Sequence, residues 1–215
     1  MAGQPEIKNM ALFCDFENLA LGVRDAKYAQ FDMQKVLERL LLKGSIIVKK
    51  AYCDWERYKA FKARMHEAAF ELIEIPHVRQ SGKNSADIRL VVDALDLCYT
   101  KAHVDTFVIL SGDSDFSPLV SKLRENNKVV IGVGVKKSTS DLLTANCDEF
   151  LFYDDLVRAQ AQQRQRAAQP ATGDVPTSTG AENGPAALRS EARAPSPYKV
   201  LVFTNTDGER RPQRH

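Results

Sequence analysis

The feature that most constrains the fold is an alternation, from residue 10 to residue 157, of short β-rich runs with longer stretches of helical periodicity. Several β-rich runs are apolar at every position, such as FVIL at 107–110, which is typical of parallel strands that helices cover on both faces. Between the runs, apolar residues recur at helical spacing, as at Val36, Leu37 and Leu40. Repeated β-α-β units with right-handed crossovers therefore predict a three-layer α/β/α sandwich around a mostly parallel central sheet.

The same pattern places the elements and the domain boundaries. Strands are expected at 10–14, 45–52, 70–75, 106–110, 128–134 and 150–153, and helices at 33–43, 55–69, 85–102, 118–126 and 139–146. Residues 1–9 form an N-terminal arm, residues 10–158 the folded domain, and residues 159–215 a low-complexity tail rich in Ala, Gln, Pro, Gly and Ser. Because the tail has few large apolar side chains to offset its ordering entropy, we expect it to be disordered.

Composition excludes several classes of protein. No apolar run approaches the ~20 residues of a membrane span, and the first ten residues lack the apolar core of a signal peptide, so we expect no membrane partner. The four cysteines, Cys14, Cys53, Cys98 and Cys147, lack the close spacing of zinc ligands and sit in or beside apolar runs. Buried free thiols fit a reducing compartment, which predicts a cytoplasmic protein.

Aspartates follow two of the predicted strands directly and stand near one strand-to-helix junction. Asp15 follows the first strand in CDFENL, and Asp113 and Asp115 follow the fourth strand in SGDSDF. Asp87 stands near the start of the third helix, in GKNSADIRLVVDA. Because functional groups of a parallel α/β sheet gather at the carboxyl ends of its strands, we expect three separate segments to bring carboxylates to one edge.

A carboxylate cluster at the mouth of a core is unfavourable unless a cation neutralises it. Ligand sets made only of oxygen favour Mg²⁺ or Mn²⁺ over zinc, and these ions serve phosphate chemistry. The closely spaced Asp113 and Asp115 therefore predict a Mg²⁺ or Mn²⁺ site. Asn18 can donate a hydrogen bond to a carboxylate or a phosphate, and Ser111 either orients the aspartates or serves as a turn residue.

Each aspartate also has a purely structural alternative. Asp15 could cap a turn, Asp113 could cap the helix near Pro118, and Asp87 suits the first turn of any helix. Asp93 stands six residues beyond Asp87, which is roughly 120° around a helix and about 9 Å along it, so both cannot ligate one ion. Asp93 therefore either supports the site or faces solvent. The convergence of several segments favours the functional alternative.

At these residues the chain resembles the NYN family of PIN-like, metal-dependent ribonucleases, over about residues 10–157. The ordered motifs are DFEN after a strand (Asp15, Asn18), AYCDW (Asp54, Trp55), KNSADIRLVVDAL (Asp87, Asp93) and SGDSDF after a strand (Asp113, Asp115). The resemblance implies a PIN-like fold and endonucleolytic cleavage of single-stranded or structured RNA. It also implies one or two Mg²⁺ or Mn²⁺ ions held by Asp15, Asp87 and Asp113, with Asp115 as a further candidate and Asn18 in support. Family members often carry an extra RNA-binding domain after the nuclease domain, whereas here only the expected tail follows.

Basic and aromatic residues near the same edge are candidates for RNA contacts. Arg79 and Lys83 lie in the loop before the third helix, and Lys136 and Lys137 follow the fifth strand. They could contact phosphates or simply aid solubility. Trp55 could stack on a base or pack under a helix. The arginines of the tail could add weak, salt-sensitive RNA binding, and the tail could equally bind a protein partner.

The expected function is metal-dependent endoribonuclease activity. His66, His77 and His103 lie away from the acidic edge, so no histidine is placed to act as the general base. The metal must then supply the attacking hydroxide, and the products carry 5′-phosphate and 3′-hydroxyl ends. One alternative is a non-catalytic RNA-binding or protein-interaction module on the same fold. Another is a phosphoryl-transfer enzyme of the Toprim or HAD type. Toprim domains require an early glutamate, and HAD phosphatases require further residues late in the chain that are not evident here. The sequence leaves open whether the protein forms a homodimer.

Overall fold

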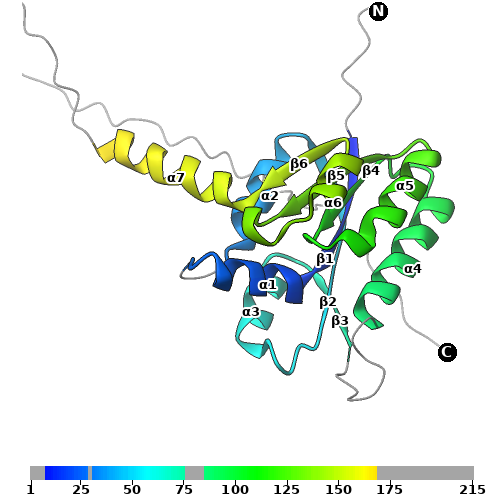
Figure 1. The fold of residues 1–215 in the computed structure, drawn as a ribbon, viewed down its shortest axis with the longest axis horizontal. Helices are drawn as coiled ribbons and strands as arrows, with labels where there is room; N and C mark the ends of the chain where they lie inside the picture. Colours follow the sequence, from blue (N-terminus) through cyan, green and yellow to red (C-terminus); the bar gives the residue numbers. More distant parts are fainter. Residues whose placement is uncertain (1–7, 29–30, 76–84, 169–215) are drawn as a thin grey trace, which may run out of the picture. The chain divides into compact units, whose positions relative to one another are not determined.

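The structure, a computed structural model, describes residues 8–28, 31–75 and 85–168, the last six by their backbone alone. Six parallel strands form one sheet in the order β3-β2-β1-β4-β5-β6 (Figure 1). The strands are β1 (Lys8–Asp15), β2 (Gly44–Cys53), β3 (Glu71–Glu74), β4 (Thr106–Leu110), β5 (Val129–Gly134) and β6 (Glu149–Phe152). The order reverses between β1 and β4, and such a switch point is where open α/β sheets bind ligands.

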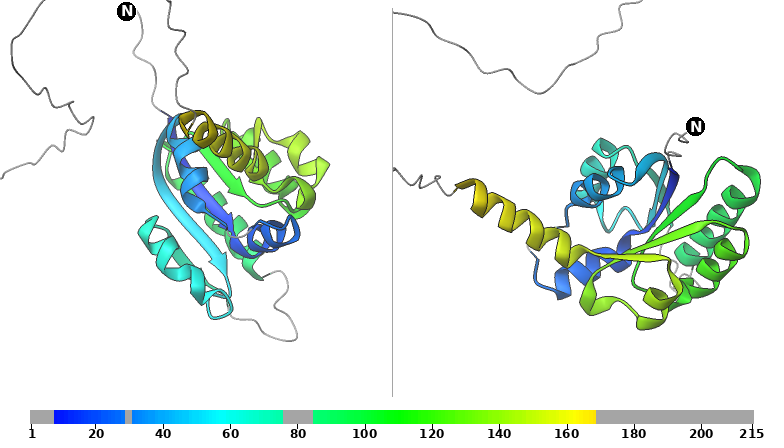
Figure 2. Two further views of the ribbon diagram at one scale, coloured as in Figure 1. Left: turned by 90° about the vertical axis from the view of Figure 1, so that its left-hand side faces the viewer. Right: turned by 90° about the horizontal axis from the view of Figure 1, so that it is seen from above.

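Helices cover both faces of the sheet. They are α1 (Phe16–Asp25), α2 (Met33–Leu41), α3 (Lys59–Glu67), α4 (Ser85–Thr100), α5 (Ser117–Glu125), α6 (Asp141–Asn146) and α7 (Tyr153–Ala168), with 3-10 helices η2 (Ser114–Phe116) and η3 (Lys136–Ser138). Alternate residues of β1 enter two separate cores: Met10, Leu12 and Cys14 pack with α1, α2, α3 and the start of α7, whereas Ala11 and Phe13 pack with α4, α5 and α6. In Figure 2 the green α4 and α5 lie across the sheet from the blue and cyan α2 and α3. The predicted three-layer sandwich is confirmed.

Every predicted strand exists, with ends shifted by at most two residues, and so do the five predicted helices. Two helices were not predicted. No helix was expected over the DFEN stretch, but α1 begins at Phe16, directly after β1, because the Asp15 carboxylate accepts a hydrogen bond from the Asn18 N–H and caps the helix. At the other end, α7 continues to Ala168, past residue 159, where the tail was expected to begin. Residues 169–215 lie outside the described residues.

Two expectations from composition can be compared with the structure. Cys14, Cys53 and Cys98 are buried free thiols, and Cys147 is half-buried. Among the described residues, no helix combines the length and the hydrophobicity needed to cross a membrane.

Phe16, the first residue of α1, lies among four other aromatic rings. Its ring centroid is 5.0 Å from that of Trp55 and 5.2 Å from that of Phe61, and Phe31 and Tyr58 pack edge-on against it. This cluster fixes the start of α1, and with it the position of Asp15, against the α3 side of the sheet.

We expect Phe16→Ala to lower the free energy of unfolding by about 3–5 kcal/mol, because the rigid rings around Phe16 cannot close the cavity. Leu142→Ala is the control, since that side chain is 58% exposed and should change stability by less than about 0.5 kcal/mol. Urea unfolding followed by circular dichroism measures both. Equal effects of the two substitutions would contradict the packing described.

Candidate active site

The site begins where β1 and β4 end side by side. Cys14 pairs with Leu110 in the sheet, so the next residues, Asp15 at the end of β1 and Ser111 directly after β4, lie side by side. The Ser111 hydroxyl donates to Asp15 Oδ2 at 3.0 Å. Across the same junction, the Gly112 N–H donates to Asn18 Oδ1 at 2.9 Å. These two hydrogen bonds join the start of α1 to the turn after β4.

Asp15 is an acid in an unfavourable position for its charge. Its side chain caps α1, and the residue is only 7% exposed. Burial raises its pKa from 3.8 to about 7, and the negative charges of Asp87 and Asp113 add to the effect, although hydrogen bonds from Asn18 and Ser111 oppose it. The capping role of Asp15 is therefore compatible with its predicted role in the site.

Asp87, Asp113 and Asp115 complete the acidic cluster. Asp87 lies half-buried in the first turn of α4, and its pKa is raised by burial and by the charges of Asp113 and Asp115. Asp113 caps η2 by accepting a hydrogen bond from the Asp115 N–H at 3.0 Å, rather than capping α5. Asp115 is exposed and lines an open groove with Ser114, Ser117, Pro118, Ser121 and Leu142. Within the described part of the chain, none of the four aspartates forms an ion pair.

The chemistry of these donors fits a hard divalent cation. Asp15 is a buried acid whose pKa is raised by burial and by the charges of Asp87 and Asp113, and a cation would compensate that repulsion. Among the described residues, however, no three His, Cys, Asp or Glu side chains converge closely enough to enclose a metal ion. Mg²⁺ is commonly held by one or two carboxylates together with water and substrate phosphates, so the arrangement suits such an open site rather than a closed cage.

The other predicted site residues fall into three groups. Asn18 and Ser111 hydrogen-bond within the site. Asp93 lies apart from it, in contacts with Tyr52, Lys50 and Arg89. Arg79 and Lys83 lie outside the described residues.

Trp55 and Lys136 are engaged elsewhere. Trp55 is 1% exposed and donates its indole N–H to the Ile73 carbonyl. Its ring therefore packs in the core and is not accessible for stacking on a base. Lys136 Nζ is 2.8 Å from Asp155 of α7. Lys137 is exposed and has no ion pair with a described residue.

Two contributors to this edge were not identified from the sequence. A side chain at Gly112 would bring its Cβ to 2.3 Å from the Ser138 carbonyl oxygen, so this glycine lets the turn after β4 approach the loop after β5. Glu17 forms a 3.0 Å ion pair with Arg57 and adds its charge to those that raise the pKa of Asp87. A glycine two residues after a buried strand was the available signal for the first, whereas nothing local indicated the second.

Comparison with known proteins identifies the family of this chain. The NYN domain family matches residues 9–154, which is more than half of the chain. The chain belongs to the NYN domain family. NYN domains have a PIN-like nuclease fold, generally act as nucleases and typically use divalent metals.

Two relatives of this NYN protein have matching sequences or structures. The Uncharacterized protein MJ0482 of Methanocaldococcus jannaschii is 27% identical over 117 residues, which cover 54% of this chain and 45% of that protein. The chain therefore spans less than half of that relative. A crystal structure of a protein of unknown function, VPA0982 from Vibrio parahaemolyticus RIMD 2210633, has a TM-score of 0.62 and 25% identity, covering 72% of this chain and 98% of the other.

Asp15→Asn should stabilise the metal-free protein at neutral and alkaline pH. Because the folded-state pKa of about 7 lies above the ordinary 3.8, the carboxyl stabilises the fold below pH 4 and loses that contribution as the pH rises through 7. Relative to wild type, we expect the variant to gain about 2–4 kcal/mol at pH 8.5 and little at pH 4. Urea unfolding in EDTA at both pH values measures the difference. Asp25→Asn, an exposed position on the same helix, is the control, and a gain independent of pH would contradict the assignment.

Proposed function

We propose that this NYN protein is a metal-dependent endoribonuclease. The observation that carries the proposal is that three segments bring Asp15, Asp87 and Asp113 to the switch point between β1 and β4 without a basic partner among the described residues. There the charges of Asp87 and Asp113 add to the burial that raises the pKa of Asp15, and those of Asp113 and Asp115 add to the burial that raises the pKa of Asp87. Such an arrangement lowers the stability of the protein, and its simplest chemical use is to bind a cation. Family membership favours a nuclease over the Toprim and HAD alternatives.

Asp15, Asp87 and Asp113 would hold a Mg²⁺ or Mn²⁺ ion, with Asp115 at the exposed side. When bound, the ion supplies the activation of water and the neutralisation of charge that phosphodiester hydrolysis requires. Ser111 and the Asn18 N–H keep the Asp15 carboxylate in one orientation through bonds of 3.0 and 3.3 Å. The RNA backbone would reach the site along the open groove beside Asp115, and the exposed Lys137 would bind a phosphate group.

The RNA contacts, the location and the association of the protein are also proposals. Arg79 and Lys83 precede α4, which carries Asp87, so RNA contacts from that loop would adjoin the cut. The protein would act in the cytoplasm on single-stranded or structured RNA. Homodimerisation and binding of RNA or protein by the tail are further proposals that rest on the sequence alone.

The test is cleavage of end-labelled single-stranded RNA in Mn²⁺, Mg²⁺ or EDTA. Wild type should cut only with a metal ion and leave 5′-phosphate and 3′-hydroxyl ends. Asp113→Asn should lower the rate by about 10²–10³-fold, because the metal contributes several kcal/mol to transition-state stabilisation. Asp25→Asn, far from the cluster on the exposed end of α1, should cut like wild type.

Three results would count against the proposal. RNA that is bound but never cut would indicate the non-catalytic binding module. Products with 2′,3′-cyclic phosphates would exclude the proposed attack by water. Equal cutting by wild type and Asp113→Asn would show that the activity does not come from this site.

A further inference from the structure

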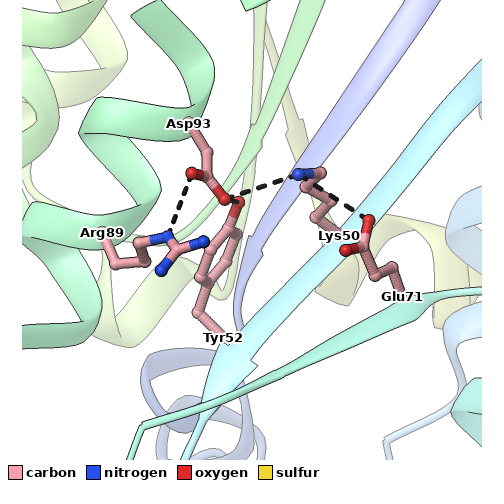
Figure 3. A network of polar contacts seen from close by, with 5 residues as sticks. All are labelled: Lys50, Tyr52, Glu71, Arg89 and Asp93. Carbon is pink, nitrogen blue, oxygen red and sulfur yellow. Dashed lines mark hydrogen bonds and ion pairs between the residues drawn. The ribbon is translucent and has the colours of Figure 1, made fainter. Parts of the chain in front are cut away.

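Asp93, the second aspartate of α4, belongs to a network separate from the carboxylate cluster (Figure 3). Asp93 Oδ2 accepts a hydrogen bond of 2.9 Å from the Tyr52 hydroxyl and lies 3.5 Å from Lys50 Nζ. Asp93 Oδ1 accepts from Arg89 Nε at 3.0 Å. Lys50 Nζ also lies 3.7 Å from Glu71 of β3. Both oxygens of Asp93 are therefore occupied by groups of the protein.

The network joins α4 to the sheet. Lys50 and Tyr52 are two residues apart on β2 and so project from the same face, toward α4 (Figure 3). Tyr52 is fully buried, and the side chains of Asp93 and Lys50 are 13% and 23% exposed. At that burial, solvent screens the contact less than it screens an ion pair on the surface.

Asp93 and Asp87 are in opposite electrostatic states although they share a helix. Burial raises the pKa of Asp93, but the hydrogen bonds from Tyr52 and Arg89 and the charge of Lys50 outweigh it and hold the pKa below its ordinary value. Burial and the neighbouring carboxylates raise the pKa of Asp87. Groups of the protein thus compensate the charge of Asp93, whereas no basic group among the described residues compensates that of Asp87.

Apolar packing holds one face of α4, and polar contacts add to it. Along its sixteen residues the helix buries Leu90, Ala94 and Cys98, and Ala86, Val91, Leu95 and Leu97 pack partly buried against the same core, whereas Ile88, in the first turn, is 63% exposed. The contacts of Asp93 with β2 lie six residues beyond Asp87 and tie the exposed-side edge of this helix to the sheet.

We propose that Asp93 is a positioning residue: through Tyr52 and Lys50 it holds α4 against β2 and thereby keeps Asp87 at the carboxylate site. This inference rests on the proposed function, since it assigns Asp87 to a metal site. It gives Asp93 a role without ligation, in keeping with the roughly 120° between the two aspartates around the helix.

Tyr52→Phe is the decisive variant, because it removes one hydroxyl, changes no charge and keeps the buried ring. We expect Mn²⁺ affinity to fall about 10-fold, as is usual when a residue that orients a metal ligand loses its partner. The kcat for RNA should fall by a similar factor while KM stays within about two-fold. Amide hydrogen exchange of residues 85–90 should become faster. Asp93→Asn should act in the same direction, and Asp96→Asn, exposed on the same helix, should behave like wild type.

Mn²⁺ binding followed by electron paramagnetic resonance, together with hydrogen exchange, separates the possible failures. Wild-type affinity and exchange in Tyr52→Phe would overturn the inference, even if RNA is cut normally. Weaker Mn²⁺ binding in Asp93→Asn alone, with unchanged exchange, would make Asp93 a ligand and overturn it as well. If wild type neither binds Mn²⁺ nor cuts RNA, the proposed function fails, whereas faster exchange in Tyr52→Phe would still establish that the network holds the start of α4.

Discussion

The pairing of β1 with β4 is the contact on which the rest of the site depends. The two strands are separated by about 90 residues of chain, yet they pair in parallel from Met10 and Thr106 to Cys14 and Leu110. All of these residues are buried, with helices on both faces, so a shift in register would expose one face of each strand. Because the register is fixed in this way, Asp15 at the end of β1 and Ser111 directly after β4 must lie side by side. The acidic site is thus a consequence of how the core packs.

That placement has an energetic consequence. The aromatic cluster around Phe16 and the cap at Asp15 stabilise the start of α1, while the same Asp15 carboxylate is desolvated and repelled by its neighbours. Each pKa unit of such a shift corresponds to about 1.4 kcal/mol of stability. A protein can retain this conflict when a bound cation relieves it during function, which is why functional sites are often locally unfavourable.

The sequence predicted the sheet well because buried parallel strands have a short-range pattern, the continuously apolar run. The same patterns predict where Asp15 and Asp113 lie, at the ends of β1 and β4, and where Asp87 lies, at the start of α4. The role of these aspartates stays a prediction. Helix α7 was missed for a physical reason: its later residues are Ala, Gln and Arg, which favour helix intrinsically but form no apolar face. Without α7, Asp155 could not be foreseen as the partner of Lys136.

Trp55 shows the same limit in a different way. The helix expected from residue 55 begins only at Lys59, because the Asp54 carboxylate accepts hydrogen bonds from the N–H groups of Glu56 and Arg57 and forms a turn. That turn directs Trp55 into the core beside Phe16. A sequence gives the residue types but not which of two neighbouring surfaces a large ring will join.

The aspartates of this fold separate according to what compensates their charge. Asp32 and Asp54 accept backbone N–H groups at the starts of helices or turns, and Asp93 is paired with Tyr52, Arg89 and Lys50. Asp15 and Asp87 differ, because for them burial and neighbouring acids outweigh every compensating contact and raise the pKa. Sequence spacing treats Asp87 and Asp93 as equals, since both fall in one motif. The distinction depends on Tyr52 and Lys50, which come from another strand, and so it is visible only in the folded chain. In the proposed function this distinction leaves Asp87 to meet a cation, while Asp93 would hold the helix in place.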